Sequence, residues 1–379
     1  MEPNWLADYR KRNETTLPTL SFPLDGFLTE RAQVCRAILP TGLIATPNVF
    51  VQMESCTLAN RLTPEAKTTG IILTDIQTAI AKHPDLVKQT LPTLTDPLSK
   101  LAASRFTNGL FLHVSDNTTL ELVSQTVAGL HVNVLNLIIV GTNAKLTLTH
   151  HLTGEGAVNQ HTHVCAGAGA IITYCAKQTA GKESIIIDNL SADAHESATV
   201  RLSAVHLGGK HVISRRDTTL NGANSNLTHT DIAFADDSQR YQLTANAIHN
   251  GQHTTGSILT HSLVKDTAKV SARGLLTIGE HGHHADSFVA QHAILLNKGA
   301  AAECVPDLEI HTSDVKASHA ASVTPINKEH LFYLETRGFN EQTARQELAL
   351  GSIEPALARM PDDFAALIRG AIENKWSAT

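Results

Sequence analysis

Short runs of aliphatic and β-branched residues follow one another from Asn108 to Val323, separated by clusters of Gly, Asn, Asp and Ser. Within the runs, apolar and polar residues alternate, as in Val132–Val140, Lys145–Thr149 and Ala198–His206. This alternation indicates β-strands, because successive side chains of a strand point to opposite faces. Almost no helical pattern interrupts the series. The middle of the chain is therefore restricted to a sandwich, a barrel, a propeller or a β-solenoid.

Composition favours the solenoid among these folds. Aromatic residues make up only 4% of the chain although hydrophobic residues make up 42%. Sandwiches and propellers tend to use large rings as anchors, whereas small and β-branched side chains stack well inside a narrow coil. The turns are frequent and lack the fixed signature of propeller blades. No strict period is visible, so the pattern alone leaves both the solenoid and the sandwich open.

The region 1–107 resembles helix and loop rather than strand. We expect helices over Leu28–Ile38, with Thr29 as its N-cap, over a segment that opens at Pro64, over Ile72–Ala81 and over Leu86–Leu91. Pro84, Pro92 and Pro97 break the end of this region into short pieces. The strand-rich core is expected to occupy residues 108–325.

Residues 326–379 return to a helical pattern. Asn327 and Asn340 are each placed to cap a helix, and Gly338 suits the left-handed turn after the first of them. A third helix is expected over Glu354–Ile372, with Leu357, Phe364, Leu367 and Ile368 close to one face. We expect this compact helical unit to cap the open end of the strand region.

The most specific motif lies between the core and the first C-terminal helix. The stretch Pro306–Ala320 contains P-x-L-E-I followed by D-V-K-A-S-H-A, and Leu331–Gly338 reads L-F-Y-L-E-T-R-G. This stretch is similar to the C-terminal signature of the SufB/SufD family of iron–sulfur cluster assembly proteins. That signature runs P-x-L-E-I, then D-V-K-C-S-H-G, then L-F-Y-L-x-S-R-G. The resemblance covers about Asn108 to Gly351 well and the first hundred residues weakly.

The resemblance implies a right-handed parallel β-helix between N-terminal and C-terminal helical regions. It further implies a scaffold subunit that is not an enzyme, pairs with SufB through the β-helix and docks the ATPase SufC through its C-terminal helices. By this resemblance the SufC-binding region contains Leu331, Phe332, Tyr333, Arg337, Gly338 and Phe339. No cofactor is expected to stay bound, whereas an iron–sulfur cluster or iron could be held transiently at the SufB interface. A homodimer is the alternative assembly.

Within the family the chain resembles the SufD members. SufB members carry a Cys where this chain has Ile310 and a Glu where it has Ala320. The Cys of the shared motif is replaced by Ala317, so no thiol can act there. His319 stands where the family histidine stands, and it is the candidate ligand for a metal or a cluster. Because side chains alternate in an extended segment, Val315, Ala317 and His319 should share one face.

Two further clusters could hold a metal, since 21 histidines are unusually many for this length. His281, His283 and Asp286 form one, and a polar turn is the favoured interpretation because no known zinc spacing occurs. His161, His163 and Cys165 alternate onto one strand face. There the ligands would be splayed about 7 Å apart, which argues against a metal. Cys304 is expected to be a buried small thiol.

Charge and motifs exclude several other functions. The net charge of −6 and the absence of a basic stripe remove the main driving force for nucleic-acid binding. The longest apolar stretches, such as Leu135–Val140, are too short to cross a membrane. The five scattered cysteines, without a CxxC pair, fit a reducing cytoplasm, which is the expected location of the chain. Two alternatives stay open, a β-helix polysaccharide lyase or hydrolase and a histidine-based metal-binding protein.

Overall fold

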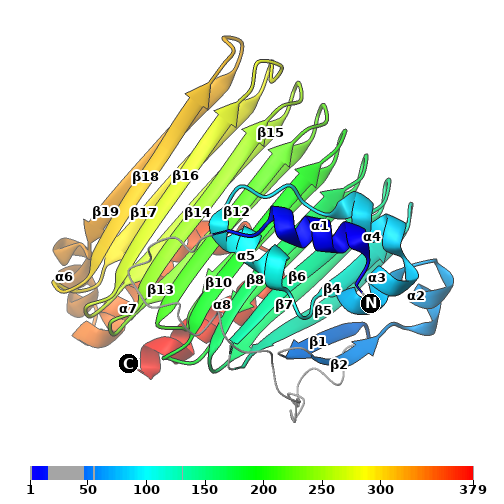
Figure 1. The fold of residues 1–379 in the computed structure, drawn as a ribbon. Coiled ribbons are helices and arrows are strands. Elements are labelled where there is room, and N and C mark those ends of the chain that lie inside the picture. The colour runs from blue at the N-terminus through cyan, green and yellow to red at the C-terminus, as the bar shows by residue number, and fades with distance from the viewer. Residues whose placement is uncertain (1, 16–46, 54–55, 130, 379) are drawn as a thin grey trace.

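The computed structural model describes residues 2–15, 47–53, 56–129 and 131–378. Its centre is a parallel β-solenoid of about eight coils (Figure 1), which confirms the predicted fold class. The expected helix at Leu28–Ile38 lies outside the described residues. In the part of the chain that is described, no helix is long and apolar enough to cross a membrane.

Two long sheets face each other along the solenoid. One has ten strands in the order β19-β17-β15-β13-β11-β9-β7-β5-β1-β2, and the other has nine in the order β18-β16-β14-β12-β10-β8-β6-β4-β3. The strands of the ten-stranded sheet are β1 (Val49–Met53), β2 (Cys56–Arg61), β5 (Thr119–Ala128), β7 (Lys145–Gly154), β9 (Ile171–Gln178), β11 (Thr199–His206), β13 (Asn226–Ala235), β15 (Thr255–Val264), β17 (Asp286–Leu295) and β19 (Lys316–Pro325).

The strands of the nine-stranded sheet alternate with these along the chain, so each coil contributes one strand to each sheet. They are β3 (Ile72–Asp75), β4 (Leu110–Val114), β6 (His131–Val140), β8 (Ala157–Ala166), β10 (Ile185–Ala194), β12 (His211–Leu220), β14 (Arg240–His249), β16 (Lys269–Ile278) and β18 (Ala301–Ile310). The alternation of apolar and polar residues arises because one face of every strand points into the narrow interior.

The turns between coils repeat the same conformation. At one corner of the solenoid a residue with φ between 54° and 65° donates its backbone N–H to a carbonyl of the following coil. Asn, His and Gly tolerate this left-handed conformation better than other residues, which explains their recurrence between the strands. The residues of this ladder are Asn117, Asn143, Gly169, Ser197, Asn224, His253 and His284.

The N-terminal region differs from the predicted arrangement of helices and loops. β1 and β2 form an antiparallel hairpin that completes one sheet, and β3 pairs antiparallel with β4 in the other. The expected helix over Ile72–Ala81 is therefore wrong in its first four residues, where β3 precedes the helix. The helices of this region are α1 (Asn4–Arg12), α2 (Pro64–Thr68), α3 (Ile76–Lys82), α4 (Pro84–Thr90) and α5 (Pro97–Arg105).

The C-terminal helices are α6 (Lys328–Thr336), α7 (Glu341–Leu357) and α8 (Asp362–Ser377). The predicted caps at Asn327 and Asn340 are confirmed, because each side chain accepts backbone N–H groups of its helix. For the third helix, expected over Glu354–Ile372, the predicted first residue is wrong. Glu354 still belongs to α7, which continues through Pro355, and α8 begins after Pro361. Leu357, Phe364 and Ile368 are buried as expected, whereas Leu367 is exposed.

The C-terminal helices do not cap the open end of the solenoid, contrary to the prediction. The apolar side chains of α7 and α8 pack in one cluster with those of β9, β11, β13, β15 and β17, on the outer face of the ten-stranded sheet. Trp376 of α8 packs against Phe234 of β13, with 5.8 Å between ring centroids. The helices thus bury their apolar side chains against the side of the sheet, and the end face stays open.

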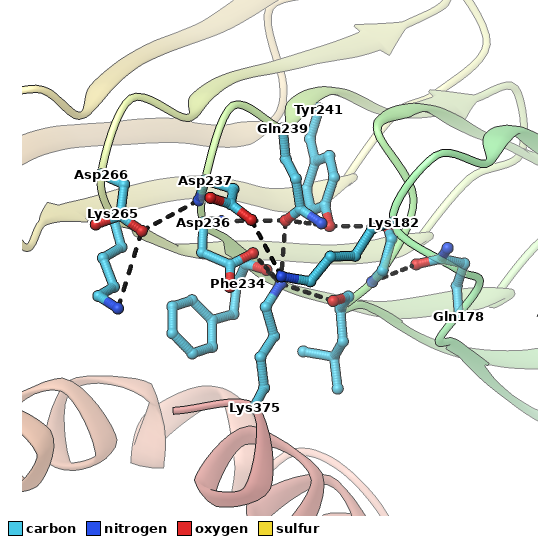
Figure 2. A network of polar contacts seen from close by, with 12 residues as sticks. Gln178, Lys182, Phe234, Asp236, Asp237, Gln239, Tyr241, Lys265, Asp266 and Lys375 are labelled. Atoms are coloured by element: carbon cyan, nitrogen blue, oxygen red, sulfur yellow. Dashed lines mark hydrogen bonds and ion pairs between the residues drawn. The ribbon is translucent and has the colours of Figure 1, made fainter. Parts of the chain in front are cut away.

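Lys375 fastens α8 to the corner of two coils (Figure 2). Its Nζ donates to the carbonyl oxygens of Leu207 at 2.6 Å and Phe234 at 2.7 Å, and to Oε1 of Gln239 at 3.0 Å. The carboxylate of Asp236 lies 2.9 Å away. Burial lowers the pKa of Lys375, and the Asp236 carboxylate opposes that shift. The ammonium group therefore replaces water as the partner of several solenoid acceptors at once.

A row of hydrogen-bonded polar side chains crosses the interior of the solenoid. Gln52 donates to Thr126, Thr126 to Gln160, and Gln160 to Asp188, over distances of 2.9, 2.7 and 3.1 Å. Asp188 then meets Arg216, whose Nη2 lies 2.5 Å from its carboxylate. Burial alone would raise the pKa of Asp188, but the positive charge of Arg216 holds that pKa below its ordinary value. Each charge is tolerated inside the coil only because the other is present.

Replacing Arg216 by Met should lower the free energy of unfolding by about 3–5 kcal/mol at neutral pH, because the Asp188 charge loses its partner. In the parent chain, Asp188 contributes stability above the ordinary Asp pKa, and that stability is lost as the pH falls through its depressed folded-state pKa. In the variant, burial raises the pKa of Asp188 because Arg216 no longer opposes it. Protonation of Asp188 at lower pH then removes the cost of burying its unpaired charge. Urea denaturation should therefore show the deficit shrinking as the pH falls from about 7 to about 4.

The matched control for this prediction is Lys210→Met, which breaks the exposed ion pair with Glu183. This change should cost no more than about 1 kcal/mol at any pH in the range. Equal losses for Arg216→Met and Lys210→Met would contradict the role given to the interior pair.

Replacing Lys375 by Met should lower the free energy of unfolding by about 2–4 kcal/mol, since the solenoid acceptors and the Asp236 carboxylate lose their donor. Hydrogen exchange of the α8 amides should accelerate before that of the solenoid strands. Lys145→Met, at an exposed position of β7, is the control and should leave both quantities unchanged. Unaltered α8 exchange in Lys375→Met would refute the fastening role.

Candidate functional site

The candidate site is the open end of the solenoid, formed by β18 and β19. These strands stand last in their sheets, and no described strand pairs with the outer edge of either (Figure 1). Parallel pairing without register shifts stacks each of their side chains on the same position of the previous coil. The end face therefore displays side chains of the kind that fill the interior elsewhere.

His319 lies in one of these core columns. It pairs in register with Val289, and the same column continues through buried residues of every earlier coil of that sheet. Its other members are Leu122, Leu148, Tyr174, Leu202, His229, Ile258 and Val289. Because no coil follows, the imidazole of His319 is exposed. The sequence contains a histidine at a position where the fold otherwise places buried side chains.

The hydrogen bonding of His319 determines which ring nitrogen is free. Its Nδ1 lies 3.0 Å from the carbonyl oxygen of Pro306. A carbonyl only accepts, so Nδ1 must carry the proton, and the neutral ring then has its lone pair on Nε2. A histidine held by one nitrogen with the other free is the usual arrangement of a metal ligand. The predicted neighbour Ala317 shares this face of β19, which begins one residue after Val315.

Apolar side chains lie on the same end face as the histidine. Ile310 is 43% exposed and Val323 is 40% exposed, although their column partners Ile278 and Ala293 are buried. Cys304 is half-buried rather than fully buried as expected, and burial raises its pKa to about 11. The thiol is therefore protonated at neutral pH. An apolar surface of this kind is typical of a protein–protein contact.

A second exposed surface lies on α6 and the turn that follows it. Phe332 is 67% exposed and Tyr333 is 55% exposed, and Phe339 also faces solvent. Leu331 is half-buried, Arg337 lies over the ring of Tyr333, and Gly338 adopts the expected left-handed conformation with φ of 96°. No residue of α6 is buried. All six residues of the predicted docking region thus lie on α6 or in the turn after it, and the three aromatic rings among them are exposed.

The structure places the two histidine clusters in different surroundings. In the described ranges no three His, Cys, Asp or Glu side chains are arranged to hold a metal ion. His281 and His283 lie in the turn before β17 rather than on a strand, so the polar-turn interpretation is confirmed. In that turn His283 contacts Thr312 at 3.2 Å, and His284 contacts Asp314 at 3.0 Å.

His161, His163 and Cys165 share the outer face of β8, as the alternation predicts. Both imidazoles contact the Ser191 hydroxyl, at 3.0 and 2.8 Å, and the Cys165 thiol lies 3.3 Å from Nε2 of His163. Burial lowers the pKa of His161 to about 3, and burial with the nearby Asp193 raises that of Cys165 to about 12. The side chains are thus neutral and partnered by one another. The four described cysteines are free thiols, as their spacing predicted.

Comparison with known proteins shows which family the chain is similar to. The family described as "SUF system FeS cluster assembly, SufBD core domain" matches residues 123–352. An iron–sulfur cluster assembly SufBD family protein of Staphylococcus saprophyticus is 24% identical over 339 residues, covering 84% of this chain and 71% of the relative. Relatives with the same description from Staphylococcus haemolyticus and Staphylococcus epidermidis are 24% and 23% identical over 333 residues each, with the same shares covered.

The matched residues 123–352 are more than half of the chain. They include the end face around His319 and the exposed surface on α6. Members of the family are generally non-catalytic components of the assembly system. The chain belongs to the SufBD family of the SUF iron–sulfur cluster assembly system.

Proposed function

We propose that this chain acts as the SufD-type scaffold subunit of a SUF assembly complex. In this proposal the open end of the solenoid pairs with SufB, and the C-terminal unit 326–379 docks the ATPase SufC. The chain supplies no turnover of its own and no resident cofactor. The observation that carries the proposal is the core column that ends in the exposed His319 on an uncovered apolar face.

Pairing through the end face would resolve two unfavourable features of the isolated chain. The strands β18 and β19 present unpaired backbone groups at their outer edges, which is the surface that strand addition uses. The exposed Ile310 and Val323 would be buried by a partner that continues the same columns. A second copy of this chain offers the same surface, so the homodimer is the competing assembly.

His319 would then contribute an imidazole ligand from this side of the contact. The absence of a thiol at Ala317 leaves SufB to provide the thiolate. A neutral imidazole and a thiolate together suit ferrous iron or an iron–sulfur cluster held for a short time. The cluster is the cargo of the complex and not a cofactor of this chain.

The test of the assembly is co-purification. The chain mixed with SufB and SufC should elute as one complex, whereas the chain alone should show no ATP hydrolysis. Separate elution of the three proteins would exclude the proposed role, and a stable homodimer that does not bind SufB would favour the competing assembly.

Replacing His319 by Ala should leave the complex intact and remove most of its cluster yield in anaerobic reconstitution, because one ligand is lost while the apolar contact remains. Absorbance of the reconstituted complex and its iron content measure the yield. His195→Ala is the control, since His195 is also exposed but lies in a turn far along the chain from β19. An unchanged yield in His319→Ala would remove this residue from cluster assembly.

Replacing Phe332 by Ala should weaken SufC binding by about 2 kcal/mol or more, because a central exposed aromatic is the usual anchor of such a contact. Alanine keeps the helical propensity of α6, so the fold should not change. Calorimetric titration with SufC gives the affinity. Glu335→Ala on the same helix is the matched control and should have little effect. Equal affinities for the two variants would contradict docking through the aromatic surface.

A further inference from the structure

A hollow of about 950 Å³ lies among the N-terminal helices, far along the chain from the signature motif and His319. Its walls come from α1, from α4, from the loop after α4 and from α5. Neither the proposed assembly role nor the SufBD signature uses this part of the chain. The lining residues are Trp5, Asp8, Tyr9, Lys11, Arg12, Asn13, Lys88, Leu91, Pro92, Thr93, Leu94 and Lys100.

The hollow is strongly positive in a chain that is negative overall. Four cationic side chains line it, Lys11 and Arg12 from α1, Lys88 from α4 and Lys100 from α5, against the single carboxylate of Asp8. None of the four forms an ion pair within the residues that the structure describes. A concave surface lined by charges of one sign concentrates the field and attracts ligands of the opposite sign.

Helix stability explains only part of this arrangement. Lys11 and Arg12 lie in the last turn of α1 and Lys88 in the last turn of α4, where a cation interacts well with the helix dipole. Lys100 lies instead near the beginning of α5, four residues after its N-cap Asp96, where the dipole gives a cation no stabilisation. The presence of Lys100 beside the other three cations is therefore not a by-product of helix stabilisation.

The hollow also offers an aromatic and apolar wall. The indole of Trp5 is half-buried in it, beside Leu91, Pro92 and Leu94 of the loop. The Tyr9 hydroxyl donates to the carbonyl oxygen of Pro92 at 3.3 Å, which ties α1 to that loop and gives the wall a fixed shape. An aromatic ring that stacks and cations that bind phosphate are the two components by which proteins hold nucleotides. The volume lies in the range of small-molecule sites.

We propose that this hollow binds a nucleotide polyphosphate, with its base against Trp5 and its phosphates among Lys11, Arg12, Lys88 and Lys100. The proposal is independent of the scaffold role, since it concerns other residues at another place in the fold. It gives the N-terminal helices a ligand-binding function in addition to their structural role, which is to cover part of one sheet of the solenoid.

The two tryptophans of the chain make a direct assay possible. In a Trp376→Phe background, which keeps an aromatic ring against Phe234, Trp5 is the only indole. Titration of the full-length chain with ADP should quench its fluorescence in a saturable way, and added salt should weaken the binding. Calorimetric titration of the unmodified chain with ADP must give the same Kd. Absence of saturable binding in both measurements would overturn the proposal.

Charge reversal tests the phosphate contacts. Lys11→Glu together with Lys88→Glu should raise the Kd for ADP at least about tenfold. Lys145→Glu together with Lys269→Glu changes the net charge equally at exposed positions of β7 and β16, and should leave the Kd within about twofold. Equal weakening in the two double variants would mean that only the overall charge of the chain matters, and would overturn the site.

Inorganic pyrophosphate tests the contribution of the ring. It carries the two phosphates of ADP without the base, so it should bind more weakly than ADP and should not quench Trp5 to the same extent. Replacing Trp5 by Ala should weaken ADP binding and leave pyrophosphate binding unchanged. Pyrophosphate binding as tight as that of ADP, with no effect of Trp5→Ala on either, would overturn the assignment of a nucleotide.

Discussion

Parallel pairing in constant register is the constraint on which the rest of the structure depends. It stacks every inward side chain on its counterpart in the neighbouring coil, so that each position of a strand becomes a column along the solenoid. Many columns are apolar, and the polar row that ends at Asp188 is satisfied by Arg216. The same rule leaves the last member of each column without a cover. The interior and the candidate interface are therefore two parts of the same arrangement.

The sequence was sufficient to predict strands but not their closure into coils. Thr119 pairs with Lys145, 26 residues later, whereas Lys269 pairs with Ala301, 32 residues later, because the turns lengthen along the chain. This drift hides the repeat from any search at a fixed period. The misassigned start at Ile72 has a local cause. Apolar spacing continues smoothly from β3 into α3, and only the cap at Asp75, whose side chain accepts from Thr78, separates them.

The sequence could name the residues of the candidate site but not their surroundings in the fold. Alternation correctly placed Ala317 and His319 on one face, and the signature motif singled out the histidine. That this face points along the core, and that the helices leave it open, follows only from the packing of α7 and α8 against the side of a sheet. The cationic hollow had no sequence pattern at all, since Lys11 and Lys100 meet only through the packing of three helices.

The contacts of Lys375 also bear on the order in which the chain is made. Its partners Leu207 and Phe234 lie 168 and 141 residues earlier. Coils that contact only their neighbours can form one after another as the ribosome releases them. The corners that receive this lysine must nevertheless wait, with their carbonyl groups bonded to water, until α8 has been synthesised. The middle of the solenoid therefore forms early and gains its final rigidity last.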